Sequence, residues 1–269
     1  MQNLFELAYN CIMAADPQRK LDLTGDSATR WSAGSCNLEA GPAVQAIAIP
    51  GRPARPPLVE PSRLERRKLS SLQGRAAFLH ALTHIEFNAI NLAWDAVYRF
   101  REMPQEFYDD WVRVAHEEAQ HFGLLRSRLQ QLGYDYGDFP AHDGLWDMAL
   151  RTAHDVLVRM ALVPRVLEAR GLDVTPAMRA RLQQVQDPDS AAILARILTD
   201  EIGHVEIGSR WFRHVCRQRG LEPAATFRTL LLEYLPGRVR SPLNRRARLQ
   251  AGFDTEELQM LEQLAEEGM

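Results

Sequence analysis

The sequence predicts an all-α protein whose centre is a bundle of four long helices. Three observations support this fold class. From Gly74 to Gly220 the apolar residues recur with helical periodicity, and strand-like alternation is rare. Glycines and prolines divide that stretch into long segments, at positions where helices commonly end. The chain has 269 residues, of which 46% are hydrophobic, so it can bury a sizeable core.

Residues 1–72 are predicted to form a helix and then an extended strap that packs on the bundle. An amphipathic segment covers about residues 2–15. Residues 41–67 are rich in proline and glycine, which argues against a helix and favours extended backbone. A disordered linker is the alternative. The apolar residues through which a strap would pack are Val44, Ile47, Ile49 and Leu58.

Residues 73–220 contain the predicted bundle helices, and each predicted end has a local cause. A residue before proline disfavours helix, and a glycine accepts the left-handed conformation of a helix C-terminus. The third stretch is followed by a short separate helix, with Thr175 as N-cap and Pro176 at its first position. The predicted helices run from Gly74 to near Met103, from about 105 to 132 before Gly133, from about 144 to 170 before Gly171, and from about 190 to 219 before Gly220.

Residues 221–269 are predicted to form a helical C-terminal extension. Two smaller helices, about 223–235 and 254–267, are separated by the Arg-rich loop "PGRVRSPLNRRARLQAGF". Of the 32 basic residues only Lys20 and Lys68 are lysines, so an arginine cluster says little about nucleic acid. A solvated loop is favoured over phosphate contacts. The arginines concerned are Arg238, Arg240, Arg245, Arg246 and Arg248, with Arg63, Arg66 and Arg67 earlier in the chain.

Charge and cysteine content exclude several classes of protein. The net charge is −3, and no hydrophobic run reaches the roughly 18 to 20 residues that span a bilayer. The N-terminus lacks the basic start and small-residue cleavage site of a signal peptide. Cys11, Cys36 and Cys216 are far apart, which argues against a disulfide framework and a zinc ribbon. We expect a cytoplasmic protein without a membrane span.

Two Glu-x-x-His motifs carry the main functional signal. The stretch "HEEAQH" contains Glu118 and His121, and "DEIGH" contains Glu201 and His204. Residues three apart lie about 60° apart around a helix, so both side chains of a motif can point at one site. One such motif alone is weak evidence, because it also arises by chance.

Two further glutamates give the motifs a context. Glu86 lies 32 residues before Glu118, and Glu168 lies 33 residues before Glu201. Each half of the bundle therefore offers one Glu from its first helix and Glu-x-x-His from its second, as in di-iron and di-manganese carboxylate proteins. The predicted metal ligands are Glu86, Glu118, His121, Glu168, Glu201 and His204.

These residue types suit two Fe ions, or one Mn and one Fe. Four carboxylates neutralise the charge of two divalent ions, and oxygen donors with one imidazole per metal leave positions open for O₂ or peroxide. Without a cation, burying an unpaired charge costs several kcal/mol. Glu117 and Asp200 each precede a motif glutamate and are predicted to accept the free N–H of a metal-bound histidine. The alternative for both is a solvated flank.

Other polar and aromatic residues near the motifs are predicted to be structural. His84 lies two residues from Glu86, so it faces roughly the opposite side of the helix. Large aromatic side chains more commonly supply apolar core area than a path for electrons. The residues assigned in this way to packing or to the surface are His80, His84, His116, Glu206, Trp111 and Trp211.

Four stretches, "HIEFNAINLAWDAVYRF", "DFPAHDGLW", "MALVPRVLEARGLDVTP" and "DEIGHVEIG", resemble a bacterial ferritin-like family described only as a domain of unknown function. The ligand pattern resembles the wider ferritin-like di-iron carboxylate superfamily. This resemblance implies a ferritin-like four-helix bundle whose ligands fall on the six residues named above. The superfamily includes ferritins, tRNA hydroxylases, quinone hydroxylases and fatty acyl desaturases, so the resemblance implies a metal centre without choosing a substrate.

The third helix departs from this pattern. If it began at Gly144, Glu168 would sit near its far end, whereas the other three ligand glutamates fall in mid-helix. A ferritin-like bundle has a crossover between its two hairpins, so we expect residues 133 to about 153 to form it. The functional third helix is then predicted to start near His154. Pro164 removes a backbone hydrogen bond and is expected to bend that helix.

The sequence thus favours an oxidoreductase that uses O₂ or peroxide to oxidise a small organic molecule, most simply by hydroxylation. Its electron donor is unknown, and a homodimer is compatible with the strap and the extension. A ferroxidase or iron-storage protein is the main alternative. A tRNA-modifying hydroxylase and a bundle with a vestigial site serving as an interaction module are further alternatives, although nucleic acid is the less favoured partner.

Overall fold

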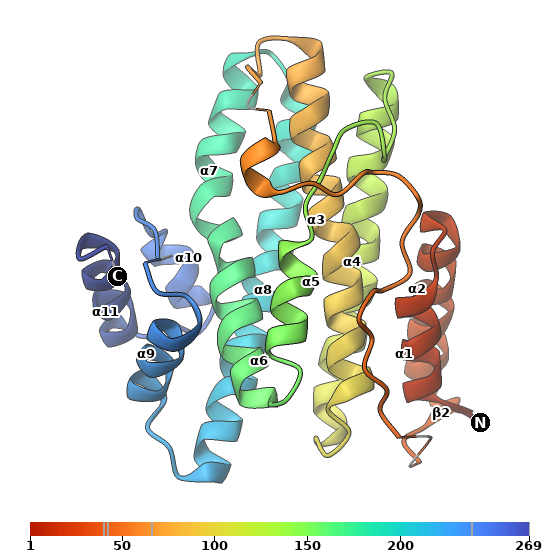
Figure 1. Cartoon of the computed structure of the whole chain (residues 1–269), viewed down its shortest axis with the longest axis vertical. Helices are drawn as coiled ribbons and strands as arrows, with labels where there is room; N and C mark the ends of the chain where they lie inside the picture. Colours follow the sequence, from red (N-terminus) through yellow and green to blue (C-terminus); the bar gives the residue numbers. More distant parts are fainter. Residues whose placement is uncertain (40, 42, 66, 238, 269) are drawn as a thin grey trace. The chain divides into compact units, whose positions relative to one another are not determined.

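The computed structural model describes residues 1–39, 41, 43–65, 67–237 and 239–268 (Figure 1). These residues are mostly helical, which confirms the predicted all-α class. The β-structure among them is one parallel pair, β1 (Gln2–Asn3) with β2 (Cys36–Asn37), and a bridge between Leu58 and Ala141. In this part of the chain every helix is too short or too polar to cross a bilayer. The chain forms two compact units, Met1–Leu150 and Arg151–Met269.

The first unit is built on two long helices joined by a short loop. These two, α3 and α4, run side by side in opposite directions, and α1 and α2 pack along them (Figure 1). The last residue of α5 falls in the second unit. The helices are α1 (Leu4–Met13), α2 (Pro17–Ser32), the 3₁₀ turn η1 (Pro61–Arg63), α3 (Leu72–Arg99), α4 (Gln105–Gln131) and α5 (Gly144–Arg151).

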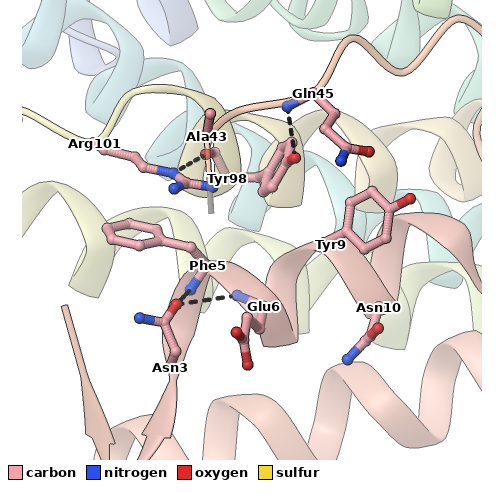
Figure 2. Close-up of a pocket in the computed structure, with 9 residues that line it drawn as sticks. All are labelled: Asn3, Phe5, Glu6, Tyr9, Asn10, Ala43, Gln45, Tyr98 and Arg101. Atoms are coloured by element: carbon pink, nitrogen blue, oxygen red, sulfur yellow. Dashed lines mark hydrogen bonds between the residues drawn. The ribbon is translucent and has the colours of Figure 1, made fainter. Parts of the chain in front are cut away.

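Side-chain caps begin both N-terminal helices. The Asn3 Oδ1 atom accepts hydrogen bonds from the backbone N–H groups of Phe5 and Glu6, at 2.9 and 3.2 Å (Figure 2). This confirms the helix predicted at about 2–15. Helix α2 was not predicted. Its sequence signal is Asp16-Pro17, because Asp16 caps Arg19 N–H at 2.8 Å and proline suits a first helical position.

The loop between α3 and α4 begins earlier than predicted. Helix α3 ends at Arg99, four residues before Met103. The Tyr108 hydroxyl of α4 donates to the Phe100 carbonyl at 3.0 Å and accepts from Met103 N–H at 3.3 Å. This long-range contact turns the backbone before proline is reached. At the other end of α4, Gly133 adopts φ +83°, as its predicted role requires.

The strap is extended, as predicted, apart from the turn η1. Hydrogen bonds to its backbone groups hold the strap: Val59 N–H donates to the Ala141 carbonyl at 2.8 Å, and the Trp146 side-chain Nε1 donates to the Ala48 carbonyl at 3.3 Å. Ile47 is buried, with 4% exposure. Val44 and Ile49 are 38% and 60% exposed, so the prediction that they pack was wrong. Polar backbone contacts therefore replace part of the expected apolar packing.

The second unit contains one long, locally distorted helix beside a regular one. Helix α6 begins at Val156, close to the predicted His154, where Asp155 caps Leu157 N–H. Helix α8 lies alongside, α9 and α10 pack against this pair of helices, and α11 packs against α9 (Figure 1). The elements are α6 (Val156–Leu162), the π-helix η2 (Val163–Glu168), α7 (Ala169–Gln184), α8 (Pro188–Arg219), α9 (Pro223–Tyr234), α10 (Arg245–Gln250) and α11 (Thr255–Glu266).

The predicted break at Gly171 was wrong, since α7 continues through Gly171 and Pro176 to Gln184. Tertiary contacts override both local signals. Leu172 is fully buried, and the buried Asp173 carboxylate accepts from Arg248 Nε at 2.9 Å and Arg248 Nη2 at 2.8 Å. Side chains held inside this stretch stabilise the helix that the local sequence would end.

The predicted tail helices are confirmed as α9 and α11, but the Arg-rich loop between them contains α10. Asn244 caps α10 by accepting from Ala247 N–H at 3.2 Å. Arg248 is 5% exposed, so the prediction of a solvated loop fails there. Arg66 and Arg238 lie outside the described residues. The division of the chain at residues 72 and 220 stays a prediction.

One buried lysine joins the N-terminal helices to α3. Lys20 is 0% exposed, and its Nζ atom donates to the carbonyls of Cys11 and Ile12 at 2.7 and 2.9 Å. It also donates to Asn91 Oδ1 at 2.6 Å. Three acceptors match the three N–H donors of an ammonium group. Lys20 thereby satisfies carbonyls in the last turn of α1.

Lys20→Met is therefore expected to lower the free energy of unfolding by about 3 kcal/mol, because it leaves buried acceptors unsatisfied. Urea unfolding followed by circular dichroism measures this loss. Lys68→Met, at the exposed lysine, is the control and should leave stability unchanged. Equal stability of the two variants would contradict the structural role of Lys20.

Candidate metal centre

The first unit brings three of the predicted ligands together in its interior. Glu86 comes from α3, whereas Glu118 and His121 come from adjacent turns of α4. The His121 Nδ1 atom lies 3.3 Å from Glu118 Oε2 and 3.9 Å from Glu86 Oε2. Each side chain offers one ligand atom, and these atoms lie within 4.8 Å of one another. The spacing read from the sequence thus corresponds to one site between two helices.

This first ligand set is almost inaccessible to solvent. Glu86, Glu118 and His121 are 5%, 1% and 0% exposed. Two carboxylates that share a buried space repel one another when both are ionised, and removing each from water costs several kcal/mol. A divalent cation offsets both penalties. Two oxygen donors and one imidazole nitrogen suit Fe, Mn or Zn, so the donor set fits a metal ion without fixing its identity.

The second unit holds the other three predicted ligands. On α8, the His204 Nδ1 atom lies 3.6 Å from Glu201 Oε1, and these side chains are 1% and 12% exposed. The same ring nitrogen therefore faces a motif glutamate in both units. Glu168 is the last residue of η2, where the predicted distortion by Pro164 takes the form of a π-helix. Short π-helical segments are frequent at functional sites.

A glycine allows η2 to approach α8 closely. A Cβ atom at Gly208 would lie 2.3 Å from the Pro164 Cγ atom, well inside van der Waals contact. Gly208 is one helical turn beyond His204, so the proline side chain packs next to the ligand-bearing part of α8. The sequence analysis missed this residue. It could have been recognised as a glycine inside a helical pattern, because such a glycine commonly has a packing reason.

Asp200, one of the two acidic residues beside the motifs, has a partner on its own helix. Asp200 is 31% exposed, and its Oδ2 atom lies 3.9 Å from Arg196 Nε on the same helix. Glu117 is half-buried on α4. The predicted roles of these two carboxylates in orienting metal-bound histidines stay predictions. The Glu206 Oε1 atom lies 3.6 Å from Arg210 Nε, as expected for a residue that turns away from the predicted ligands.

Two of the three histidines assigned to packing or to the surface are confirmed as packing residues. The His84 Nδ1 atom lies 2.9 Å from the Tyr136 hydroxyl, and its Nε2 atom lies 3.1 Å from the His142 carbonyl. His80 Nε2 accepts from Gly137 N–H at 2.9 Å. Both histidines therefore bind the segment 136–142, which follows α4. Trp111 and Trp211 are 2% and 4% exposed, which confirms their core positions.

A pocket at the far end of α3 is separate from the ligand set. Its volume is about 360 Å³, and polar and aromatic residues line it together with Arg101, whose guanidinium lies over the Phe5 and Tyr98 rings (Figure 2). Tyr98 is 12 residues beyond Glu86, or about 18 Å along the helix. This pocket therefore does not open onto Glu86.

The fold and the ligand set define a class: a predominantly helical protein with a buried Glu/His group that could bind a metal ion. Comparison with known proteins then gives the family. The chain belongs to the family described as "Protein of unknown function (DUF455)", whose model matches residues 13–259. An "Uncharacterized protein" of Haemophilus influenzae is 49% identical over 213 residues, which cover 77% of this chain and 74% of that protein. No solved structure matches the chain.

If the first ligand set binds a metal ion, that ion should stabilise the folded protein against unfolding. Mn(II) at 100 times its dissociation constant should stabilise the parent protein by about 2.7 kcal/mol. Glu118→Gln should lose most of this gain, because an amide is a poorer ligand than a carboxylate. Thermal unfolding with and without Mn(II) measures it. Glu106→Gln, at an exposed position on the same helix, is the matched control. A full Mn(II) response in Glu118→Gln would contradict the assignment.

Because His80 and His84 are buried, we expect the stability of the fold to decrease at acidic pH. Burial lowers the pKa of His80 and of His84 to about 4, below the value of 6.5 for an unfolded chain. The unfolded state then binds more protons between pH 6.5 and 4, so stability falls as the pH drops through this window. In His84→Gln the slope of unfolding free energy against pH should decrease by about 1.4 kcal/mol per pH unit. Urea unfolding at several pH values tests this, and an unchanged slope would count against it.

Proposed function

We propose that the two ligand sets together bind two metal ions, Fe/Fe or Mn/Fe, in one centre. The observation that carries this proposal is the burial of Glu86, Glu118 and His121 around a common point, because such a group needs a compensating cation. The matching composition of the two sets supports a second ion. The ligands in the proposal are Glu86, Glu118 and His121 in the first set and Glu168, Glu201 and His204 in the second.

We infer that the protein is an oxidoreductase. When bound, such a metal pair supplies open coordination positions and electrons for the activation of O₂ or peroxide, which then oxidises a small organic substrate. The resemblance to di-iron carboxylate proteins supports this reaction class. An electron donor and a homodimeric state belong to the same proposal.

The chain's own contribution is to hold the ions and to exclude water. Phe87 directly follows Glu86, and Phe122 directly follows His121. Their rings lie 5.7 Å apart, and Tyr136 packs on both at 5.4 and 5.3 Å. This aromatic layer beside the first ligand set lowers the local dielectric, which strengthens binding of a cation by carboxylates. It also limits access of water from that side.

The arginine contacts do not favour an RNA substrate. Arg245 Nη1 donates to both carboxylate oxygens of Glu262, at 2.8 and 2.6 Å, and Arg248 is buried against Asp173. These two guanidinium groups are engaged within the chain. Iron handling remains the second candidate, because a ferroxidase would use the same ligands.

Metal content and O₂ consumption test the proposed function. Protein produced with both iron and manganese should contain two metal ions per chain, and its reduced form should consume O₂. Glu201→Gln should lose metal and the O₂ reaction, whereas Glu206→Gln on the same helix should keep both. If the purified parent protein contains neither iron nor manganese, the proposal is wrong.

Size in solution separates the two candidates. A monomer or dimer that consumes O₂ without accumulating iron favours the oxidoreductase. A large closed shell that stores iron would favour the ferroxidase.

A further inference from the structure

A buried arginine lies three residues before Glu168 in η2. Arg165 is 0% exposed, and its guanidinium carbon lies 4.7, 4.1 and 4.6 Å from the ring centroids of Phe212, Phe227 and Phe253. These rings come from α8, from α9 and from the segment before α11. A guanidinium enclosed by three aromatic rings gains cation–π attraction but still requires a buried counterion.

The counterion comes from the first turn of α11. Arg165 Nη2 donates to Glu257 Oε1 at 2.5 Å, and Arg213 Nη2 donates to Glu257 Oε2 at 3.1 Å. Glu257 is fully buried. It also belongs to the capping box of α11, in which Asp254 Oδ1 accepts from Glu257 N–H at 2.8 Å. The carboxylate that starts α11 therefore also neutralises the arginine of η2.

Contacts thus hold η2 on two sides. Pro164 packs against α8 where Gly208 leaves room, and the next residue, Arg165, reaches the C-terminal extension. A π-helical segment replaces the i→i+4 hydrogen bonds of an α-helix with i→i+5 bonds and is rare, so contacts with its neighbours help to hold its shape. Glu168 is the last residue of this segment.

We propose that the C-terminal extension positions Glu168, through the ion pair between Arg165 and Glu257. Arg165 and Glu257 are positioning residues in this proposal, which rests on the proposed function in so far as Glu168 is a metal ligand. A buried ion pair adds little net stability compared with apolar packing, but it fixes one arrangement of the groups that it joins. This explains why the extension carries a charged group into an aromatic core.

Glu257→Gln in the full chain tests the proposal with two readouts. In metal-free protein, hydrogen–deuterium exchange should become faster in residues 163–169 and stay unchanged around Glu118. In a Mn(II) titration followed by the EPR signal of the free ion, one of the two bound ions should bind at least about tenfold more weakly, the effect typical of losing a group that orients a ligand.

Two matched variants separate positioning from general destabilisation. Glu262→Gln makes the same substitution on the same helix but removes the pair with Arg245, which does not reach η2. Asp95→Asn disrupts a buried ion pair with Arg99 in the first unit. Both should keep normal exchange in residues 163–169 and two normal Mn(II) sites. If Glu257→Gln does not fold, Phe227→Leu removes one aromatic face and should give the same changes at smaller amplitude.

The outcomes distinguish this proposal from the proposed function. Unchanged exchange in residues 163–169, or two normal Mn(II) sites in Glu257→Gln and Phe227→Leu, would overturn positioning by the extension. A parent protein that binds no Mn(II) or Fe(II) would overturn the metal centre and, with it, the role of Glu168. Faster exchange together with one weakened ion supports the proposal.

Discussion

The burial of two carboxylates and an imidazole between α3 and α4 is the constraint on which the proposed function depends. Glu86, Glu118 and His121 lie in the interior of the first unit, and none of them is more than 5% exposed. Such a group is stable when protons or a cation balance its charge, and a divalent ion does so with the donor atoms already in place. Selection for stability alone would favour apolar residues here. The group is therefore better explained by chemistry than by folding, as expected where a functional site departs from the rules of core packing.

The second unit carries its three predicted ligands on less regular structure. Glu201 and His204 lie on an unbroken helix, but Glu168 ends a π-helical segment that contains Pro164. This segment has the i→i+5 hydrogen bonds of a π-helix instead of the i→i+4 bonds of an α-helix, and contacts with neighbouring residues help to hold it. Gly208 permits close packing on one side, and Glu257 supplies a buried counterion on the other. The C-terminal extension can then be understood as part of the ligand framework.

Much of the fold could be predicted from periodicity and caps, because those signals are local. Both motif helices were predicted with nearly correct bounds. The errors share a cause: α7 passes through Gly171 and Pro176 because a buried Arg248–Asp173 pair holds it, and α3 ends early because Tyr108 binds its loop. The candidate ligands could be identified from their spacing in the sequence alone. Arg165 was not, since its partner Glu257 lies 92 residues away and no local pattern connects them.

The central claim is that the two ligand sets hold two metal ions in one centre. Anomalous diffraction at the iron and manganese absorption edges, from crystals of protein grown with both metals, tests it most directly. The account predicts two anomalous peaks about 3 to 4 Å apart, one beside His121 and the other beside His204. No peak at these histidines, or a single ion bound by other residues, would contradict it.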